Sequence, residues 1–143
     1  MRLLKNHKSR KITARRVRWV RDLVSGNYTQ GKGALKMQSG GSTKHCCLGV
    51  ACEGLDPEYR ELNLTHGTSI AYIIDKNAKK FGLTKEDQSE ASRWNDTLGY
   101  DFDRIADMVA FATEFNTPFT MSKPIRDSVN HGYAIEWLKQ YDS

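Results

Sequence analysis

The sequence contains only three prolines and three cysteines among its 143 residues, and it lacks any long apolar run. Three cysteines, an odd number, are a poor basis for a disulfide framework, so we expect a reducing, cytosolic setting. The apolar runs are only a few residues long, so we expect no segment that spans a bilayer and no membrane partner. No apolar run follows the basic start, which predicts that there is no secretory signal.

Familiar catalytic and cofactor motifs are also absent. The stretch GKGAL at residues 31–35 lacks the G-x-x-x-x-G-K-[ST] spacing of a P-loop, and no G-x-G-x-x-G dinucleotide fingerprint occurs. Neither a nucleophile elbow nor an H-E-x-x-H zinc motif is present. We therefore predict a protein that is not an enzyme and that needs no cofactor.

Acidic residues are missing from the first 21 positions, which carry nine lysines and arginines. The remaining 13 basic residues stand against 17 acidic ones, so residues 22–143 have a net charge of −4 although the whole chain has +5. A basic segment binds phosphate-rich partners through counterion release, an effect that weakens as salt is added. The alternative is a solvated tail that only aids solubility.

Hydrophobic periodicity predicts mostly helices. Residues 1–12 have no clear period and are expected to form a loosely ordered basic arm, before a single globular domain over residues 13–143. Thr13 is the expected N-cap of a first helix that Gly26 ends. Further helices are expected at about residues 69–81, 85–94, 102–115 and 127–141, with a loop or short strand between Pro118 and Pro124.

Turn residues predict a small amount of sheet. Glycines at 40 and 41 favour a hairpin at residues 39–42, and a second short strand is expected to end at His45 and run into a helix that closes near Gly54. The predicted fold class is therefore α+β: a helix-dominated single domain with a small antiparallel β-hairpin or sheet.

The segment KHCCLGVACEGL at residues 44–55 holds every cysteine of the chain. Cys46 and Cys47 are adjacent and lack the C-x(2–4)-C spacing of zinc sites, so no metal site is predicted. Cys47, near an expected helix N-terminus, is the thiol that could be acidified as a nucleophile. Free cysteines are among the most buried side chains, however, so we expect Cys46, Cys47 and Cys52 to pack as small apolar groups.

The segment SGNYTQGKGALK at residues 25–36 combines glycines with an aromatic ring, an amide and lysines. Glycines let backbone N–H groups approach a ligand, while Tyr28 offers stacking and Gln30 offers hydrogen bonds. We predict a pocket for an anionic, nucleotide-like ligand, formed by Arg15, Arg18, Arg21, Tyr28, Gln30, Lys32, Lys36, Lys44 and His45. The alternative is that the glycines serve only the turns of a hairpin entry.

Three motifs occur in order along the chain: W-V-x-x-L-x-S-G-x-Y-x-Q-G-x-G-x-L at residues 19–35, C-C-L-G-V-x-C at 46–52 and N-D-x-x-G-x-x-F-x-x-I-A-D at 95–107. Together they resemble a family of small, largely uncharacterised proteins encoded by tailed bacteriophages. The resemblance covers roughly residues 19–107 and implies a protein made in the cytoplasm of an infected bacterium. Small accessory phage proteins commonly act by binding, which is an argument about the class alone.

The leading hypothesis is a non-catalytic phage accessory protein of the anti-defence type that binds and sequesters an anionic nucleotide ligand, with a homo-oligomer as one arrangement open to it. The alternative is a nucleic-acid or host-protein binder that acts through the basic N-terminal arm. A thiol- or metal-dependent enzyme is a third hypothesis.

Overall fold

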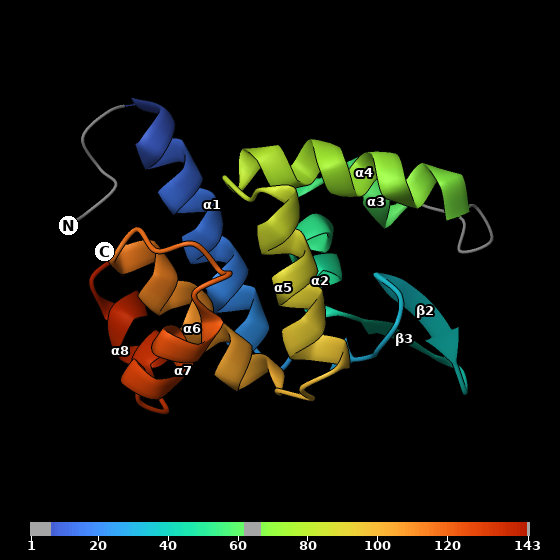
Figure 1. The fold of residues 1–143 in the computed structure, drawn as a ribbon. Coiled ribbons are helices and arrows are strands. Elements are labelled where there is room, and N and C mark those ends of the chain that lie inside the picture. Colours follow the sequence, from blue (N-terminus) through green and yellow to red (C-terminus); the bar gives the residue numbers. More distant parts are fainter. Residues whose placement is uncertain (1–6, 62–66, 143) are drawn as a thin grey trace.

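A computed structural model describes residues 7–61 and 67–142 (Figure 1). This part of the chain contains eight helices and one three-stranded sheet, so the predicted helix-dominated α+β class is confirmed. The elements are α1 (His7–Val24), β1 (Thr29–Gln30), β2 (Lys36–Ser39), β3 (Ser42–His45), α2 (Cys47–Leu55), α3 (Pro57–Arg60), α4 (Gly67–Lys80), α5 (Lys85–Asp96), α6 (Phe102–Glu114), α7 (Ser122–Ser128) and α8 (Tyr133–Lys139).

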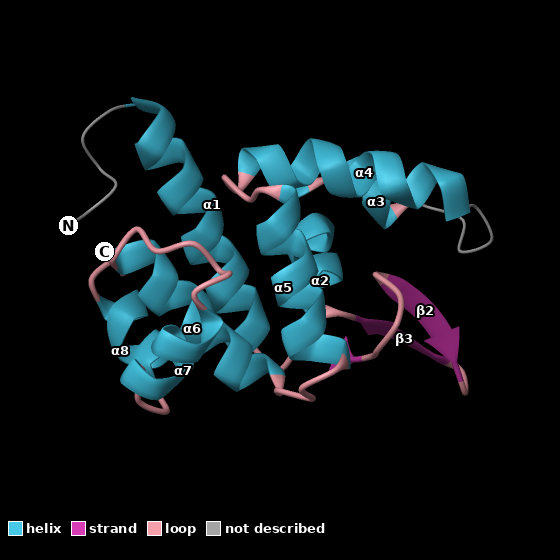
Figure 2. Ribbon diagram, in the orientation of Figure 1, coloured by secondary structure: helices cyan, strands magenta, loops and turns pink. Residues whose placement is uncertain are grey.

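Helix α1 runs between two groups of helices. It packs against α6 and α8 on one side and against α2 on the other, while the sheet lies at the far end of α2 (Figures 1 and 2). Its apolar stripe supplies Val17, Trp19, Val20 and Leu23 to the core, each at most 5% exposed. Trp19 is therefore part of the core.

Helix α1 begins at His7, six residues before the expected N-cap. Thr13 is only 3% exposed and lies inside the helix, so its hydroxyl does not cap the start. The extra turns are held by tertiary contact, because a Cβ on Gly82 would lie 3.0 Å from a methyl group of Ile12. Residues 7–12 of the predicted arm thus belong to α1, and residues 1–6 lie outside the described residues.

The sheet is mixed rather than purely antiparallel. The predicted hairpin is present, with β2 and β3 joined at Gly40 and Gly41, whose positive φ angles of 58° and 83° suit a two-residue hairpin turn. Strand β1 then pairs in parallel with β3. It is held there by the amide of Gln30, which donates to Asn95 Oδ1 (2.8 Å) and to the carbonyl of Tyr100 (2.9 Å).

Two helices begin at caps formed by side chains close to them in the chain. Thr84 and Asp87 make the reciprocal capping box of α5, and the Asp101 carboxylate caps α6 by accepting from the Arg104 N–H. Each cap lies within three residues of its partner, which is why the sequence alone reveals it.

The C-terminal region differs from the prediction. Instead of one helix over 127–141 there are two short ones, separated by Gly132 at φ 88°. Pro124 lies in the first turn of α7, where its missing N–H costs nothing, and not in a strand. Helix α8 starts where the buried Asp107 carboxylate accepts the N–H groups of Gly132 and Ala134.

Candidate functional site

A groove between α1 and α2 has an apolar floor and a charged rim. Its volume is about 230 Å³, and it is lined by Ala14, Arg15, Arg18, Trp19, Asp22, Ala51, Gly54, Leu55 and Phe81. The floor is firm because the rings of Trp19 and Phe81 meet edge to face at 5.5 Å and are both nearly fully buried. Small side chains at positions 14, 51 and 54 leave the space above the floor open.

Two arginines from one side of α1 stand at the rim. They are three residues apart, which places them on the same helix face. Arg15 donates from Nη1 to the carbonyl oxygen of Lys80 at 3.0 Å, which ties it to the end of α4. Arg18 has a side chain that is 66% exposed, and its Nε lies 3.7 Å from Asp22 Oδ2. An exposed pair at that distance contributes little, so Arg18 can turn toward a bound anion at small cost.

Asp22 is the acidic member of the rim. Burial raises the pKa of this carboxyl, and the nearby Arg18 opposes that rise. Gly54 lets the carboxylate lie close to α2, since a Cβ there would be 2.6 Å from Asp22 Oδ2. With two arginines and one aspartate, the rim has a net positive charge.

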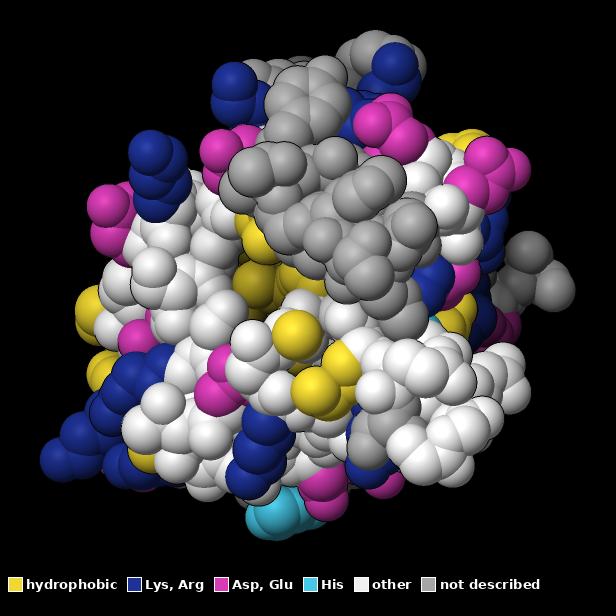
Figure 3. Space-filling model, turned by 90° about the vertical axis from the view of Figure 1, so that its right-hand side faces the viewer, with side chains coloured by type: hydrophobic (Ala, Val, Ile, Leu, Met, Phe, Trp, Pro, Cys, Tyr) yellow, Lys and Arg dark blue, Asp and Glu magenta, His cyan; other side chains and the backbone are white. Residues whose placement is uncertain are grey.

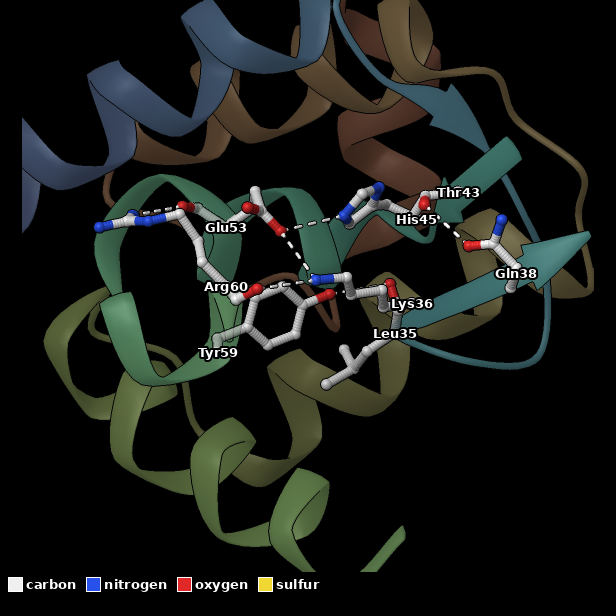
Figure 4. A network of polar contacts seen from close by, with 8 residues as sticks. All are labelled: Leu35, Lys36, Gln38, Thr43, His45, Glu53, Tyr59 and Arg60. Carbon is white, nitrogen blue, oxygen red and sulfur yellow. Dashed lines mark hydrogen bonds and ion pairs between the residues drawn. The ribbon is translucent and has the colours of Figure 1, made fainter. Parts of the chain in front are cut away.

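A second hollow, of about 430 Å³, is polar and lies where the sheet meets α2; its lining is Asn27, Tyr28, Thr29, Lys36, Thr43, His45 and Glu53. Lys36 and His45 are direct partners across β2 and β3. Figure 4 shows Glu53 pointing between them, with Oε1 at 3.2 Å from His45 Nε2 and 3.6 Å from Lys36 Nζ.

The carboxylate of Glu53 pairs with both basic side chains of this second hollow, His45 and Lys36. Burial lowers the pKa of His45 although Glu53 opposes the effect, so the imidazole is neutral at pH 7 and donates from Nε2 to Glu53. Its Nδ1 is buried and has no partner among the described residues. Lys36 is engaged by Glu53, by the carbonyl of Arg60 at 3.3 Å and by the ring of Tyr59. The hollow therefore has little positive charge left for an anion.

Tyr28 lines the polar hollow. Its ring lies edge-on to His45 with centroids 5.3 Å apart. Burial raises the pKa of Tyr28, and the charges of Asp22 and Glu53 raise it further, while those of Arg18 and Arg60 oppose the rise.

The nine residues predicted to bind a ligand are divided among several places. Arg15 and Arg18 line the groove, whereas Tyr28, Lys36 and His45 line the polar hollow. The structure does not bring the other four to either hollow. Arg21 pairs with Asp142 at 3.2 Å, Gln30 holds β1 in place, Lys32 is exposed beside Gly99, and Lys44 is half-buried on β3 opposite Met37.

Sequence reasoning missed most of the groove itself. Asp22, Ala51, Leu55 and Phe81 were not among the predicted residues, although they form its wall and floor. One signal was present, because small residues three apart on α2, at 51 and 54, mark a close approach to another helix. Phe81 could not have been found this way, since it follows α4 and reaches the groove only through the fold.

The cysteines are buried, as expected, and their thiols are poor nucleophiles. Burial raises the pKa of Cys46 to about 11 and that of Cys52 to about 12, and it raises that of Cys47 well above its usual value. The N-terminus of α2 does not offset this loss of solvation at Cys47, whose thiol donates to the carbonyl of Ala91 at 3.4 Å. Within residues 7–61 and 67–142, no three His, Cys, Asp or Glu side chains are grouped so as to hold a metal ion.

A third hollow, of about 560 Å³, contains Asp101, Asp103 and Asp107 among its lining. Two of these carboxylates have structural roles, since Asp101 caps α6 and Asp107 accepts backbone N–H groups at the start of α8. On the face drawn in Figure 3, hydrophobic side chains lie in a central hollow, and basic and acidic side chains are interspersed around it. The third hollow, with these carboxylates and Arg104 in its lining, has an excess of negative charge that disfavours an anion, and the face in Figure 3 mixes both signs.

Comparison with known proteins does not place the chain, because no protein-family model, no curated protein and no solved structure matches it. In the described part of the chain, no helix has both the length and the apolar character needed to cross a bilayer. The function therefore has to be argued from the groove and its rim.

Proposed function

We propose that the protein is a non-catalytic binding protein that holds an anionic nucleotide in the groove between α1 and α2. The observation that carries this is the pairing of an apolar floor with two arginines on one rim. A flat base can bury its faces against Leu55 and the floor, while its phosphate accepts hydrogen bonds from Arg15 and Arg18.

The size of the groove favours a ligand that is only partly enclosed. Pockets for drug-sized ligands are roughly 300–1,000 Å³, whereas this groove is about 230 Å³. One base fits such a space, and its phosphates would remain at the rim. Two charge-assisted hydrogen bonds contribute about 1.5–3 kcal/mol each before the cost of association, so a measurable affinity also requires that the base be buried against the apolar floor.

The biological setting belongs to the same proposal. The three ordered motifs support an accessory protein of a tailed phage, which would sequester a nucleotide of the host's defence in the cytoplasm of the infected bacterium. One of the motif residues, Trp19, contributes to the floor of the groove.

Calorimetric titration against a panel of cyclic and linear nucleotides tests the proposal. We expect measurable heats of binding with the wild-type protein. Arg18→Ala should lower the affinity about five- to tenfold. Arg21→Ala is the matched control, because it removes the same charge from the same helix but on the side of Asp142. Ala14→Trp, at an exposed position on the rim, should block the groove without disturbing the core. Flat heats with every nucleotide would refute the proposal.

A second candidate function, nucleic-acid or host-protein binding through the basic N-terminal segment, is favoured by one observation. Arg10 and Lys11 are exposed on the first turns of α1, so their charges are presented by a helix. This function predicts that Arg10→Glu with Lys11→Glu abolishes duplex binding, and that affinity falls steeply with salt. Unchanged binding by that double variant would exclude it.

A further inference from the structure

The groove has one strongly basic end, located where α4 terminates. Phe81, the residue after α4, contributes to the floor, and Arg15 is bonded to the carbonyl of Lys80. Lys79 and Lys80 are exposed, and Lys11 is exposed one turn before Arg15 on α1. Arg15 and three exposed lysines on the adjoining helix turns therefore give this end its positive charge, whereas the rim's aspartate lies about two turns further along α1, beside Gly54.

The C-terminus of α4 works against an anion, but its effect is smaller. A helix C-terminus acts like roughly half a negative charge, concentrated on its last carbonyl groups. Here those carbonyls already accept hydrogen bonds, from Arg15 at Lys80 and from the buried Arg16 at Phe81 and Gly82. About half a negative charge, already compensated, is outweighed by four whole positive charges at the surface.

We propose that this basic end binds a polyphosphate chain, so that the ligand class is a nucleoside 5′-polyphosphate rather than a monophosphate. The inference rests on the proposed function, because the base must occupy the groove for its phosphates to reach this end. The α- and β-phosphates lie along Arg18 and Arg15, and further phosphates meet Lys79, Lys80 and Lys11.

Each added phosphate should tighten binding by roughly three- to tenfold, since it gains one or two exposed charge pairs. The test titrates AMP, ADP and ATP into the full chain by calorimetry, in EDTA so that no divalent cation covers the phosphates. We expect affinity to rise in that order. Lys79→Ala with Lys80→Ala should remove the rise from ADP to ATP while leaving the affinities for AMP and ADP unchanged.

The control removes two positive charges elsewhere. Lys32→Ala with Lys123→Ala changes two exposed lysines that are not at the groove, and it should keep the full rise from AMP to ATP. Circular dichroism of each double variant confirms that the fold is retained.

The outcomes separate the two proposals. Equal affinity for AMP, ADP and ATP would overturn the polyphosphate inference and leave the proposed function standing. A rise from ADP to ATP that survives Lys79→Ala with Lys80→Ala, or that the control pair also removes, would overturn the assignment to this end. Flat heats with these three and with every other nucleotide of the panel would overturn the proposed function. Inorganic triphosphate binding as tightly as ATP would overturn it as well, because the apolar floor would then have no part in recognition.

Discussion

Gly49 in α2 is the position where one methyl group should have the largest effect. An added Cβ would lie 1.9 Å from the carbonyl oxygen of Leu35 and 2.9 Å from the hydroxyl of Tyr59. The nearer contact is backbone, which cannot rotate away as the end of a side chain can. Gly49→Ala must therefore push α2 and the start of β2 apart.

The cost can be worked out from what the Leu35 carbonyl does. It accepts hydrogen bonds from the N–H of Cys46 at 3.1 Å and from the hydroxyl of Tyr59 at 3.2 Å. Loss of these two bonds costs about 1 kcal/mol each, and overpacking adds about 1–3 kcal/mol. Better helix propensity returns about 1 kcal/mol. We expect Gly49→Ala to lower the free energy of unfolding by about 2–4 kcal/mol, and Tm by roughly 10 °C.

Gly54→Ala is the matched control on the same helix. Its Cβ would meet the ends of the Asp22 and Arg18 side chains, which can turn aside, and the gain in helix propensity is the same. We expect its free energy of unfolding to stay within about 1 kcal/mol of the wild type. Urea denaturation of both variants, followed by circular dichroism, measures the difference. If Gly49→Ala is as stable as Gly54→Ala, the close approach of α2 to the Leu35 carbonyl is refuted.

Three further predictions concern buried polar groups. Arg16→Ala should lower the free energy of unfolding by about 2–4 kcal/mol, because two carbonyls that follow α4 lose their donor. Arg21→Ala breaks only an exposed ion pair, so it should cost under about 1 kcal/mol in the same urea assay. Because the folded pKa of His45 is lowered, the unfolded chain takes up a proton that the native state resists, so stability should fall as pH drops below about 6.5. His45→Gln should reduce the loss of stability between pH 7.5 and 5.5, whereas His131→Gln, the control, should not. An identical pH dependence in both variants would show that His45 is not the group responsible. The three thiols should react with a disulfide reagent at pH 8 only after denaturation, and labelling of the native protein within minutes would show that they are accessible.

Local chemistry made part of the fold predictable. The box of Thr84 and Asp87, the cap at Asp101 and the glycines of the hairpin act within three residues, and the sequence displays each of them. Thr13 offered an equally good local signal that was overridden, because Ile12 packs beside Gly82, some 70 positions away. A helix start that is decided by such a contact is invisible to periodicity.

The candidate site likewise has one part that local spacing predicts and another part that only the fold brings together. The spacing of Arg15 and Arg18 on one helix face could be read directly, and both line the groove. The other predicted cations could not be assessed from the sequence, because their partners arrive through the fold: Arg21 meets Asp142, and Lys36 meets Glu53. A list of basic residues therefore overestimates the positive charge left for a ligand.

The position of α1 at the centre of the molecule has a consequence for synthesis on the ribosome. Arg16 bonds to Thr113, which lies 97 residues later in the chain. At about 5–20 residues per second, α1 leaves the ribosome roughly 5–20 s before α6, one of the helices that pack against it. During this time the side of α1 that α6 covers in the folded protein remains exposed. A chain that stops before α6 would expose that side permanently to chaperones and proteases.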